Sequence, residues 1–301
     1  MRRRTFLSRA ASAVLAGSTG QLYAGAGPSL TFPTAPRDRL AVASYPFRKL
    51  LDPHSGRQRL AAFPALVVSR FGVKGIEPLS AHFPSTEESY LKTFKDAIAK
   101  AGTHVVNIPM NPGGSLYDPD PGKRRAAVDN SKHWIDVAQF LEAPSIRVGV
   151  HGPVGVPPDL DRTVDSLKAI ATYGREKNVI VNLENDDPHA EDAFFLVKVM
   201  EQVGDPYLRG LPDFCNSMVE KHGDEDFNYR ALKAMFSRAY NISHAKDSER
   251  AGQTIYRVSM KRCFEIARES GYRGYFSMEW EGAGEPFGGT QKLIEEALRF
   301  M

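Results

Sequence analysis

The chain lacks three features that would each have indicated a particular class of protein. It has only two cysteines, Cys215 and Cys263, in unlike contexts, so the sequence contains no disulfide framework. No apolar run reaches the ~20 residues that a membrane-spanning helix needs. No glycine-rich dinucleotide-binding turn follows the first predicted strand, where SYPFRK stands instead. These absences argue against a disulfide-stapled domain, a membrane-spanning protein and a dinucleotide-binding open sheet.

The chain also has little net charge once its first 26 residues are set aside. The whole sequence carries a formal charge of +3. Residues 1–26 hold four arginines and no acidic residue, which leaves 35 basic and 36 acidic residues, a formal charge of −1, for the remainder. Nucleic-acid binding usually needs a basic excess. The composition therefore gives no support to a polyanion-binding surface.

The first 26 residues are similar to an export signal. Residues 2–7 (RRRTFL) open a positively charged region, a weakly apolar stretch follows at 10–17, and residues 24–26 (AGA) offer a small-residue cleavage site. The Arg-Arg-x-Phe-Leu order resembles a twin-arginine signal; the alternative is a disordered, arginine-rich N-terminus with no export role. We therefore expect an exported, periplasmic or extracellular protein, with residues 27–38 as a linker to a domain at 39–301.

Strand-like and helix-like stretches alternate from residue 40 to the end. This alternation over about 260 residues is typical of a (β/α)8 TIM barrel, an α/β fold, although a doubly wound open sheet would alternate in the same way. Glycines at 102, 204 and 271 stand where helix C-termini are expected. The predicted strands are 40–47, 73–79, 104–110, 145–151, 179–186, 208–216, 240–247 and 275–282, and the predicted helices are 60–71, 87–101, 124–141, 160–178, 190–203, 228–238, 254–270 and 289–300.

Each of the last four predicted strands carries one strong metal-ligand residue near its end. These residues are Glu184, Asp213, His244 and Glu279, at intervals of 29, 31 and 35 residues. A single Glu at a strand end is more often an ion-pair partner or a cap, but only barrel closure brings four successive strand ends around one point. Three carboxylates and one imidazole suit one divalent ion, Mn²⁺, Mg²⁺ or Co²⁺ rather than structural Zn²⁺, although Zn²⁺ remains an option.

With these residues in place, the sequence resembles the sugar isomerase/epimerase superfamily with a xylose-isomerase-like TIM barrel, over about residues 40–301. The superfamily's Glu, Asp, His, Glu metal ligands, at the ends of strands five to eight, match the four residues above. The HAKD at 244–247 is similar to its His-x-Lys-Asp stretch, and Arg250 matches a substrate-contacting Arg of the epimerases. The epimerases usually carry a second His three residues after the metal Asp. This chain has Asn216 there, which can hydrogen-bond a hydroxyl but cannot titrate.

The resemblance implies a metal-dependent sugar isomerase or epimerase acting on a non-phosphorylated sugar or polyol. A divalent ion chelated by a carbonyl and the adjacent hydroxyl would stabilise the enediolate that forms when the α-proton is removed. Glu184 and Glu279 would be the catalytic pair that removes and returns this proton from opposite faces of the substrate. Asp213 and His244 would be ligands only.

Five further residues are candidates for substrate binding, and some of them have a structural alternative. His151, at the end of the fourth predicted strand, could equally pack or cap. Lys246 and Arg250 could form structural ion pairs. Glu77, at the end of the second strand, could orient a ligand or the substrate. The complete set is Glu77, His151, Asn216, Lys246 and Arg250.

Three other functions fit parts of the sequence. A lyase of the same superfamily, such as a dehydratase or a 3-keto-glycoside eliminase or hydrolase, would begin with the same proton abstraction but would change the product mass. A barrel like that of endonuclease IV would need three metals and several more histidines. A non-catalytic sugar- or partner-binding barrel would lack the metal. The expected partner is a small carbohydrate, with no nucleic acid and no membrane span; a homo-oligomer is compatible with the sequence, which does not specify the oligomeric state.

Overall fold

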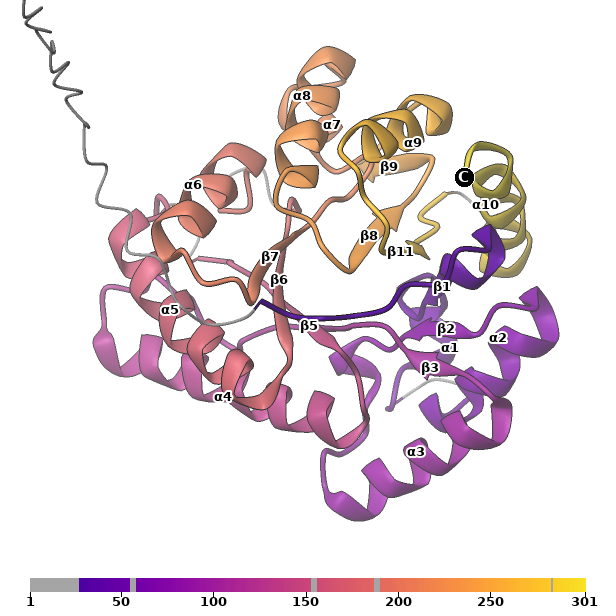
Figure 1. Ribbon diagram of the computed structural model, residues 1–301, viewed down its shortest axis with the longest axis horizontal. Helices are drawn as coiled ribbons and strands as arrows, with labels where there is room; N and C mark the ends of the chain where they lie inside the picture. Colours follow the sequence, from indigo (N-terminus) through magenta and orange to yellow (C-terminus); the bar gives the residue numbers. More distant parts are fainter. Residues whose placement is uncertain (1–26, 55–57, 153–155, 187–189, 283) are drawn as a thin grey trace, which may run out of the picture.

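A ring of parallel strands forms the centre of the protein, surrounded by helices, in the computed structural model of Figure 1. The structure describes residues 27–54, 58–152, 156–186, 190–282 and 284–301. The predicted signal at residues 1–26 lies outside this part of the chain. The strands are β1 (Leu40–Ala43), β2 (Gly75–Glu77), β3 (His104–Val105), β4 (Ile108–Met110), β5 (Ser145–Val148), β6 (Ile180–Glu184), β7 (Leu208–Leu211), β8 (Ile242–Ala245), β9 (Ser248–Ala251), β10 (Thr254–Arg257) and β11 (Tyr275–Met278). The helices are α1 (Arg48–Leu51), α2 (Phe63–Phe71), α3 (Glu88–Ala101), α4 (Pro121–Phe140), α5 (Leu160–Lys177), α6 (Ala193–Val203), α7 (Ser217–Glu220), α8 (Glu225–Phe236), α9 (Met260–Glu269) and α10 (Pro286–Phe300).

The strands pair in chain order around a closed ring. One sheet has the order β3-β2-β1-β11-β8 and a second has the order β4-β5-β6-β7, with every pair in them parallel. β3 and β4 are separated by only two residues and act as one barrel strand. Single bridges from Gly210 to Ala239 and from Asp213 to His244 join the second sheet back to the first. The predicted TIM barrel is confirmed.

Helix ends follow from local sequence signals. α5 begins after Asp159, whose side chain accepts a hydrogen bond from the backbone N–H of Arg162, and it ends at Asn178 in the left-handed region (φ 55°). α3 and α6 end at Gly102 (φ 65°) and Gly204 (φ 66°), as the sequence predicts. Capping and left-handed C-terminal residues satisfy backbone groups that a helix end leaves unpaired, and so they fix where each βα unit turns.

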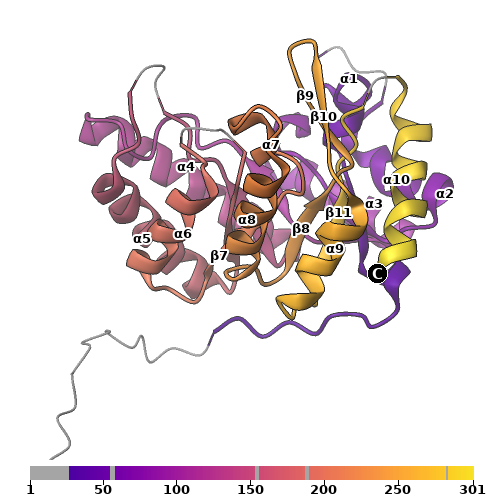
Figure 2. The same cartoon turned by 90° about the horizontal axis from the view of Figure 1, so that it is seen from above.

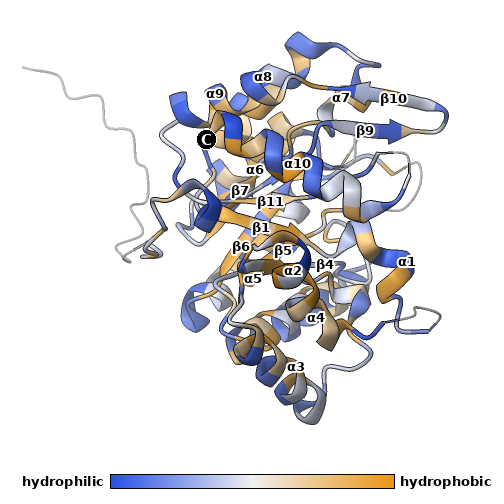
Figure 3. Cartoon of the chain, turned by 90° about the vertical axis from the view of Figure 1, so that its right-hand side faces the viewer, coloured by the Kyte–Doolittle hydropathy of each residue, from blue (hydrophilic) through white to orange (hydrophobic). Residues whose placement is uncertain are grey.

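Alternation along the strands separates an apolar outer layer from a polar barrel interior. In β6, Val181 and Leu183 belong to the main hydrophobic core, whereas Asn182 and Glu184 lie on the opposite face of the strand. Asn182 donates to Asn241 across the interior at 3.2 Å and both are fully buried. Figure 3 shows the contrast between the apolar strands and the hydrophilic outer surfaces of the helices. The interior face is thus the one that carries chemistry.

One predicted helix is partly wrong. Residues 254–270 were expected to form a single helix, but Thr254–Arg257 is β10, which pairs antiparallel with β9 in a register that joins Ala251 to Thr254. Gly252 has φ 62° and supplies the turn between the two strands, a conformation that glycine adopts without strain. α9 starts only after Ser259, whose hydroxyl accepts from the backbone N–H of Arg262. The hairpin rises above the barrel on the side shown at the top of Figure 2.

The N-terminal segment crosses the opposite end of the barrel (Figure 2). Residues 27–38, predicted to be a linker, lie against the strand beginnings. The Tyr240 hydroxyl accepts from the backbone N–H of Leu30 at 2.9 Å and donates to the Pro28 carbonyl at 2.8 Å. Phe32 packs edge-on against Tyr240 and Tyr275. In the described part of the chain no helix is long and apolar enough to cross a membrane.

Candidate metal centre

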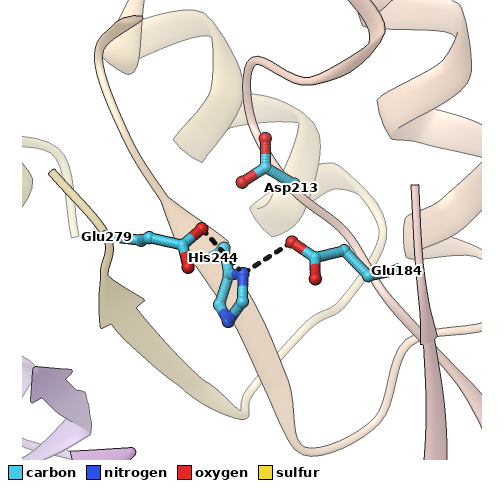
Figure 4. Close-up of side chains that lie close together, drawn as sticks. All are labelled: Glu184, Asp213, His244 and Glu279. Carbon is cyan, nitrogen blue, oxygen red and sulfur yellow. Dashed lines mark hydrogen bonds and ion pairs between the residues drawn. The ribbon is translucent and has the colours of Figure 1, made fainter. Parts of the chain in front are cut away.

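Four side chains from four successive barrel strands meet at the C-terminal mouth (Figure 4). They are Glu184 at the end of β6, Asp213 just after β7, His244 in β8 and Glu279 just after β11. One possible ligand atom of each lies within 4.8 Å of the others. Glu184, Asp213 and His244 are 4%, 0% and 1% exposed, and the Glu279 side chain is 12% exposed. The structure therefore brings together the four residues that the sequence analysis singled out.

His244 uses its two ring nitrogens in different directions. Nδ1 lies 2.6 Å from Oε1 of Glu184 and 3.1 Å from Oε2 of Glu279. The two glutamates stand on either side of the ring in Figure 4. Nε2 points away from them and lies 3.0 Å from both carboxylate oxygens of Glu77. Nδ1 is therefore the nitrogen that faces the centre.

Glu77 lies behind His244 and does not line the cavity at the mouth. Besides the imidazole, its carboxylate accepts hydrogen bonds from the Asn107 amide at 2.8 Å and the Ser277 hydroxyl at 2.5 Å. It is fully buried. Of the roles that the sequence allowed for Glu77, orienting a ligand fits this position, because buried carboxylates that accept from a histidine fix its tautomer and ring orientation.

Asp213 supplies the observation that tests whether a metal fits. Its Oδ1 accepts from the backbone N–H groups of Cys215 at 2.8 Å and Asn216 at 2.7 Å. Its Oδ2 is buried and has no hydrogen-bond partner in the described part of the chain. The nearest cation is Lys246, whose Nζ lies 3.6 Å away. A buried carboxylate oxygen without a partner is costly, and a divalent cation among three carboxylates and Nδ1 would satisfy it. The residues present fit the metal.

The loop that carries Asp213 is held by Asn185, a residue the sequence analysis did not single out. The Asn185 side-chain oxygen accepts from the backbone N–H of Asp213 at 2.8 Å, and its amide donates to the Asp213 carbonyl at 3.2 Å and to Ser217 at 3.1 Å. Because Asn185 directly follows Glu184, one strand end fixes the position of two of the four side chains. In the sequence, the only indication of this role is that Asn185 is a polar residue directly after Glu184.

Protonation in the four-residue cluster reflects an excess of negative charge. Burial raises the pKa of Asp213 well above its usual range. Burial also raises the pKa of Glu184, against the opposing effect of His244. For His244 burial acts to lower the pKa, but Glu184, Glu279 and Glu77 outweigh it and raise this pKa well above the ordinary value. Burial opposes ionisation of Glu279, yet His244 lowers its pKa to about 2. The cluster thus favours a positive charge at its centre.

Arg147 is the main site residue that sequence reasoning missed. Its Nε lies 2.8 Å from Oε2 of Glu184 and its Nη2 lies 2.6 Å from Oδ2 of Asp186. The residue is 8% exposed and projects from β5 into the barrel. Its presence in an otherwise apolar predicted strand was a signal, since a buried arginine needs acidic partners. Arg147 holds one carboxylate oxygen of Glu184 in place and leaves the other facing His244.

His151 lies beside a second acidic group, outside the metal cavity. Its Nδ1 is 3.4 Å from Oε2 of Glu191, and its side chain is 40% exposed. Glu191 accepts from the backbone N–H of Val150 at 2.6 Å, and burial raises the pKa of Glu191 to about 8. His151, Asp186 and Glu191 have ligand atoms within 4.8 Å of one another, but the guanidinium of Arg147 already supplies this group with a cation. The structure does not bring His151 to the four-residue cluster.

Lys246 is buried among carboxylates at the mouth. Its Nζ lies 2.5 Å from Glu249, 2.6 Å from Glu281 and 3.9 Å from Glu279. Its side chain is 1% exposed. Asn216 and Lys246 both line a cavity of about 210 Å³ above the four-residue cluster. Arg250 does not line this cavity; it is exposed on β9 and lines a larger neighbouring cleft.

The chain matches the family described as "Xylose isomerase-like TIM barrel" over residues 66–301. No curated protein matches it. Solved structures do resemble it. A xylose isomerase-like TIM barrel protein from Mycobacterium smegmatis in complex with magnesium is 16% identical, with a TM-score of 0.67, 90% of this chain covered and 96% of that one.

Two sugar epimerases share the same architecture. The D-allulose 3-epimerase from Methylomonas sp. in complex with D-allulose is 14% identical, with a TM-score of 0.68, 90% of this chain covered and 98% of that one. The 3-keto-D-glucoside 4-epimerase from E. coli is 14% identical, with a TM-score of 0.62, 87% of this chain covered and 99% of that one. At these identities the likeness extends to the fold.

Proposed function

Because the chain belongs to the xylose isomerase-like TIM barrel family, we propose that it is a divalent-metal-dependent sugar isomerase or epimerase acting on a non-phosphorylated sugar or polyol. The observation that carries this proposal is the position of Glu184 and Glu279 on either side of His244, within reach of one ion. Two carboxylates facing one centre are what proton removal and return next to a carbonyl require. Structural neighbours that are epimerases of D-allulose and of a 3-keto-D-glucoside support the substrate class.

The side chains of the cluster would bind the metal and transfer the proton. Glu184, Asp213, His244 through Nδ1, and Glu279 would hold the metal. When bound, a divalent ion polarises a carbonyl and stabilises negative charge on its oxygen. One glutamate removes the proton from the carbon next to the carbonyl, and the other returns a proton to the opposite face. Arg147 keeps Glu184 oriented, and Glu279 lies on the opposite side of His244.

The donor set also indicates the kind of ion. Three carboxylates and one imidazole are typical of hard or intermediate cations such as Mn²⁺, Mg²⁺ or Co²⁺, with Zn²⁺ as a further choice. The neighbour from Mycobacterium smegmatis is a complex with magnesium. Metal analysis of the purified protein beside a Glu184→Gln, Glu279→Gln variant is the first test. About one ion per chain that is lost in the variant supports the site, whereas no ion in either protein after soaking with divalent salts would contradict it.

Product mass then separates two outcomes of the same proton abstraction. An isomerase or epimerase gives a product of unchanged mass when incubated with free ketoses, aldoses and inososes. A lyase would give a lighter product, with loss of water or an aglycone. We propose the first outcome, and detection of a lighter product by mass spectrometry would assign the lyase instead.

We also propose that the protein is exported through its twin-arginine-like N-terminus. The Arg-Arg-x-Phe-Leu order supports this, and an exported enzyme would meet non-phosphorylated sugars. Cell fractionation of the parent and of an Arg3→Lys, Arg4→Lys variant tests it. Retention of the variant inside cells that export the parent is the expected result, and equal distribution of the two proteins would contradict it.

A further inference from the structure

A second, larger cleft adjoins the metal cavity. It has a volume of about 700 Å³ and lies between the segment after β1 and the segment after β11, which meet at one side of the mouth. Glu281 lines both spaces. Arg48 lines the cleft and stacks over the ring of Tyr45 at 4.3 Å, and Tyr45 lines the metal cavity. A ligand at the metal could therefore extend directly into the cleft.

The two volumes differ in what they can accept. Pockets for drug-sized ligands usually measure about 300–1,000 Å³. The metal cavity, at about 210 Å³, falls below this range and suits one small ring. The cleft, at about 700 Å³, falls within it. A free monosaccharide at the metal would leave the cleft empty. The cleft therefore has room for a substituent attached to the sugar.

The cleft offers apolar surface for a ring. Phe287 lines it and is partly exposed, and Phe47, whose ring centroid lies 5.1 Å from that of Phe287, is buried in the core beside it. Trp280 lines it as well, and it is packed against two glycines. A Cβ at Gly282 would lie 2.8 Å from the indole, and one at Gly289 would lie 2.2 Å from it. Both contacts are closer than real Cβ atoms approach, so the absence of side chains at these two positions is what allows the indole to lie there.

The cleft also carries cations that no acidic side chain neutralises. Arg48, Lys49 and Arg250 line it and are exposed, and among the described residues none of the three pairs with a carboxylate. The two acids of the lining are already engaged. Glu281 pairs with Lys246 at 2.6 Å, and Glu285 caps α10 by accepting from backbone N–H groups. The cleft is thus basic, in contrast to the acidic metal cavity.

We propose that the substrate is a glycoside whose sugar ring carries the reacting carbonyl and whose aglycone is a ring bearing a carboxylate, with the sugar at the metal and the aglycone in the cleft. This rests on the proposed function, because it places the reacting sugar beside Glu184 and Glu279. The ring contacts Phe287 and Trp280. The carboxylate faces the cations at the rim, where charge attraction in water is modest and sensitive to salt.

Three glucosides without a free carbonyl test the proposal as unreactive probes. Methyl, phenyl and 4-carboxyphenyl β-D-glucopyranoside are titrated by calorimetry into the full chain with Mn²⁺ present. The phenyl ring should tighten binding by about tenfold over methyl through apolar burial, and the carboxylate should add a further factor of about five. Arg250→Gln combined with Lys49→Gln should remove the gain from the carboxylate and leave the gain from the ring. Lys233→Gln, which removes one positive charge from an exposed residue of α8, should alter neither.

The outcomes separate this proposal from the proposed function. Equal dissociation constants for the three probes, or no binding by any, would overturn the glycoside proposal. A carboxylate gain that survives the Arg250→Gln, Lys49→Gln change, or that high salt does not weaken, would overturn the role of the cations. Metal content is measured on the same samples. The protein could hold no metal and still bind the three probes with the expected order of dissociation constants. That result would contradict the metal-dependent function but support the proposed role of the cleft.

Discussion

His244 donates its Nε2 proton toward Glu77, with that nitrogen 3.0 Å from each carboxylate oxygen, while Nδ1 faces Glu184 at 2.6 Å. Glu77 comes from β2, early in the chain, whereas the four-residue cluster comes from strands in its second half. The contact sets which nitrogen of the imidazole holds a proton when the ring is neutral. It leaves the Nδ1 lone pair directed at the centre, where a metal ligand must present it.

Replacement of Glu77 by Gln should weaken metal binding without removing any ligand. The amide keeps the shape of the side chain but loses its charge and presents a donor where Ser277 now donates. Loss of such a carboxylate behind a ligating histidine typically lowers metal affinity by about 10–100-fold. Calorimetric titration with Mn²⁺ measures the change. Glu88→Gln, an exposed change of equal charge on α3, is the control, and an unchanged affinity in Glu77→Gln would show that the contact is only structural.

Metal binding should release a proton and weaken in acid. The acidic neighbours of His244 raise its pKa above the ordinary value, so the metal-free imidazole is protonated at neutral pH and its proton competes with the ion. Affinity should therefore rise with pH, by up to about tenfold per unit while one proton is displaced. Titrations with Mn²⁺ at pH 6, 7 and 8, each in two buffers of different ionisation enthalpy, count the protons released. A pH-independent affinity with no proton release would argue against His244 as a ligand.

The sequence was informative about this centre because parallel strands end at a common edge. Once Glu184, Asp213, His244 and Glu279 are each placed at the end of a strand, barrel closure alone brings them together. No comparable rule applies to side chains within the barrel. Arg147 and Asn182 lie in mid-strand, and their partners depend on the register and tilt of neighbouring strands, which one sequence does not reveal.

Two other differences have separate causes. The strand β10 falls within a predicted helix because residues 254–270 have a helical pattern in their second half, and Gly252 does not stand out in the sequence as a turn. Residues 27–38 have the composition of a loop, but they contact Tyr240 and Tyr275, which lie more than 200 residues further along the chain. Composition describes the propensity of a segment and not the surface on which it packs.

Removal of the Lys246 charge should destabilise the protein most when metal is absent. Its ammonium lies within 4.0 Å of four carboxylates, those of Asp213, Glu249, Glu279 and Glu281. Breaking a buried ion pair by removing one partner usually costs about 3–5 kcal/mol, so Lys246→Gln should lower the free energy of unfolding by about that amount. Saturating Mn²⁺ should recover part of the loss, because it supplies positive charge to the same carboxylates.

Urea unfolding with and without Mn²⁺ measures this effect. Lys95→Gln is the matched control, since Lys95 pairs with Glu142 at 2.8 Å on an exposed surface, where such a pair contributes about 1 kcal/mol or less. Adding Glu249→Gln to Lys246→Gln should restore stability by removing one uncompensated charge. Equal effects of the Lys246 and Lys95 changes would contradict the account of the buried cluster.

His82 should make the fold sensitive to mild acid at a place remote from the metal ligands in sequence. It is 3% exposed, and its Nδ1 lies 2.9 Å from the Ser44 hydroxyl, which also accepts from the backbone N–H of Leu79. Burial lowers the pKa of His82 from 6.5 to about 4. The unfolded chain therefore binds a proton between these two pH values when the folded chain does not, and stability must fall as the pH drops from about 6.5 toward about 4.

The size of the effect follows from the two pKa values of His82. Between pH 7.5 and pH 5 the contribution amounts to about 2 kcal/mol of lost stability. His82→Gln, which cannot titrate, should lose about 2 kcal/mol less than the parent over the same interval. Urea midpoints of both proteins at pH 7.5 and pH 5, without added metal, make the comparison, because other acid-sensitive groups then contribute equally to each. Parallel losses in parent and variant would mean that His82 takes up a proton in the folded protein as readily as in the unfolded chain.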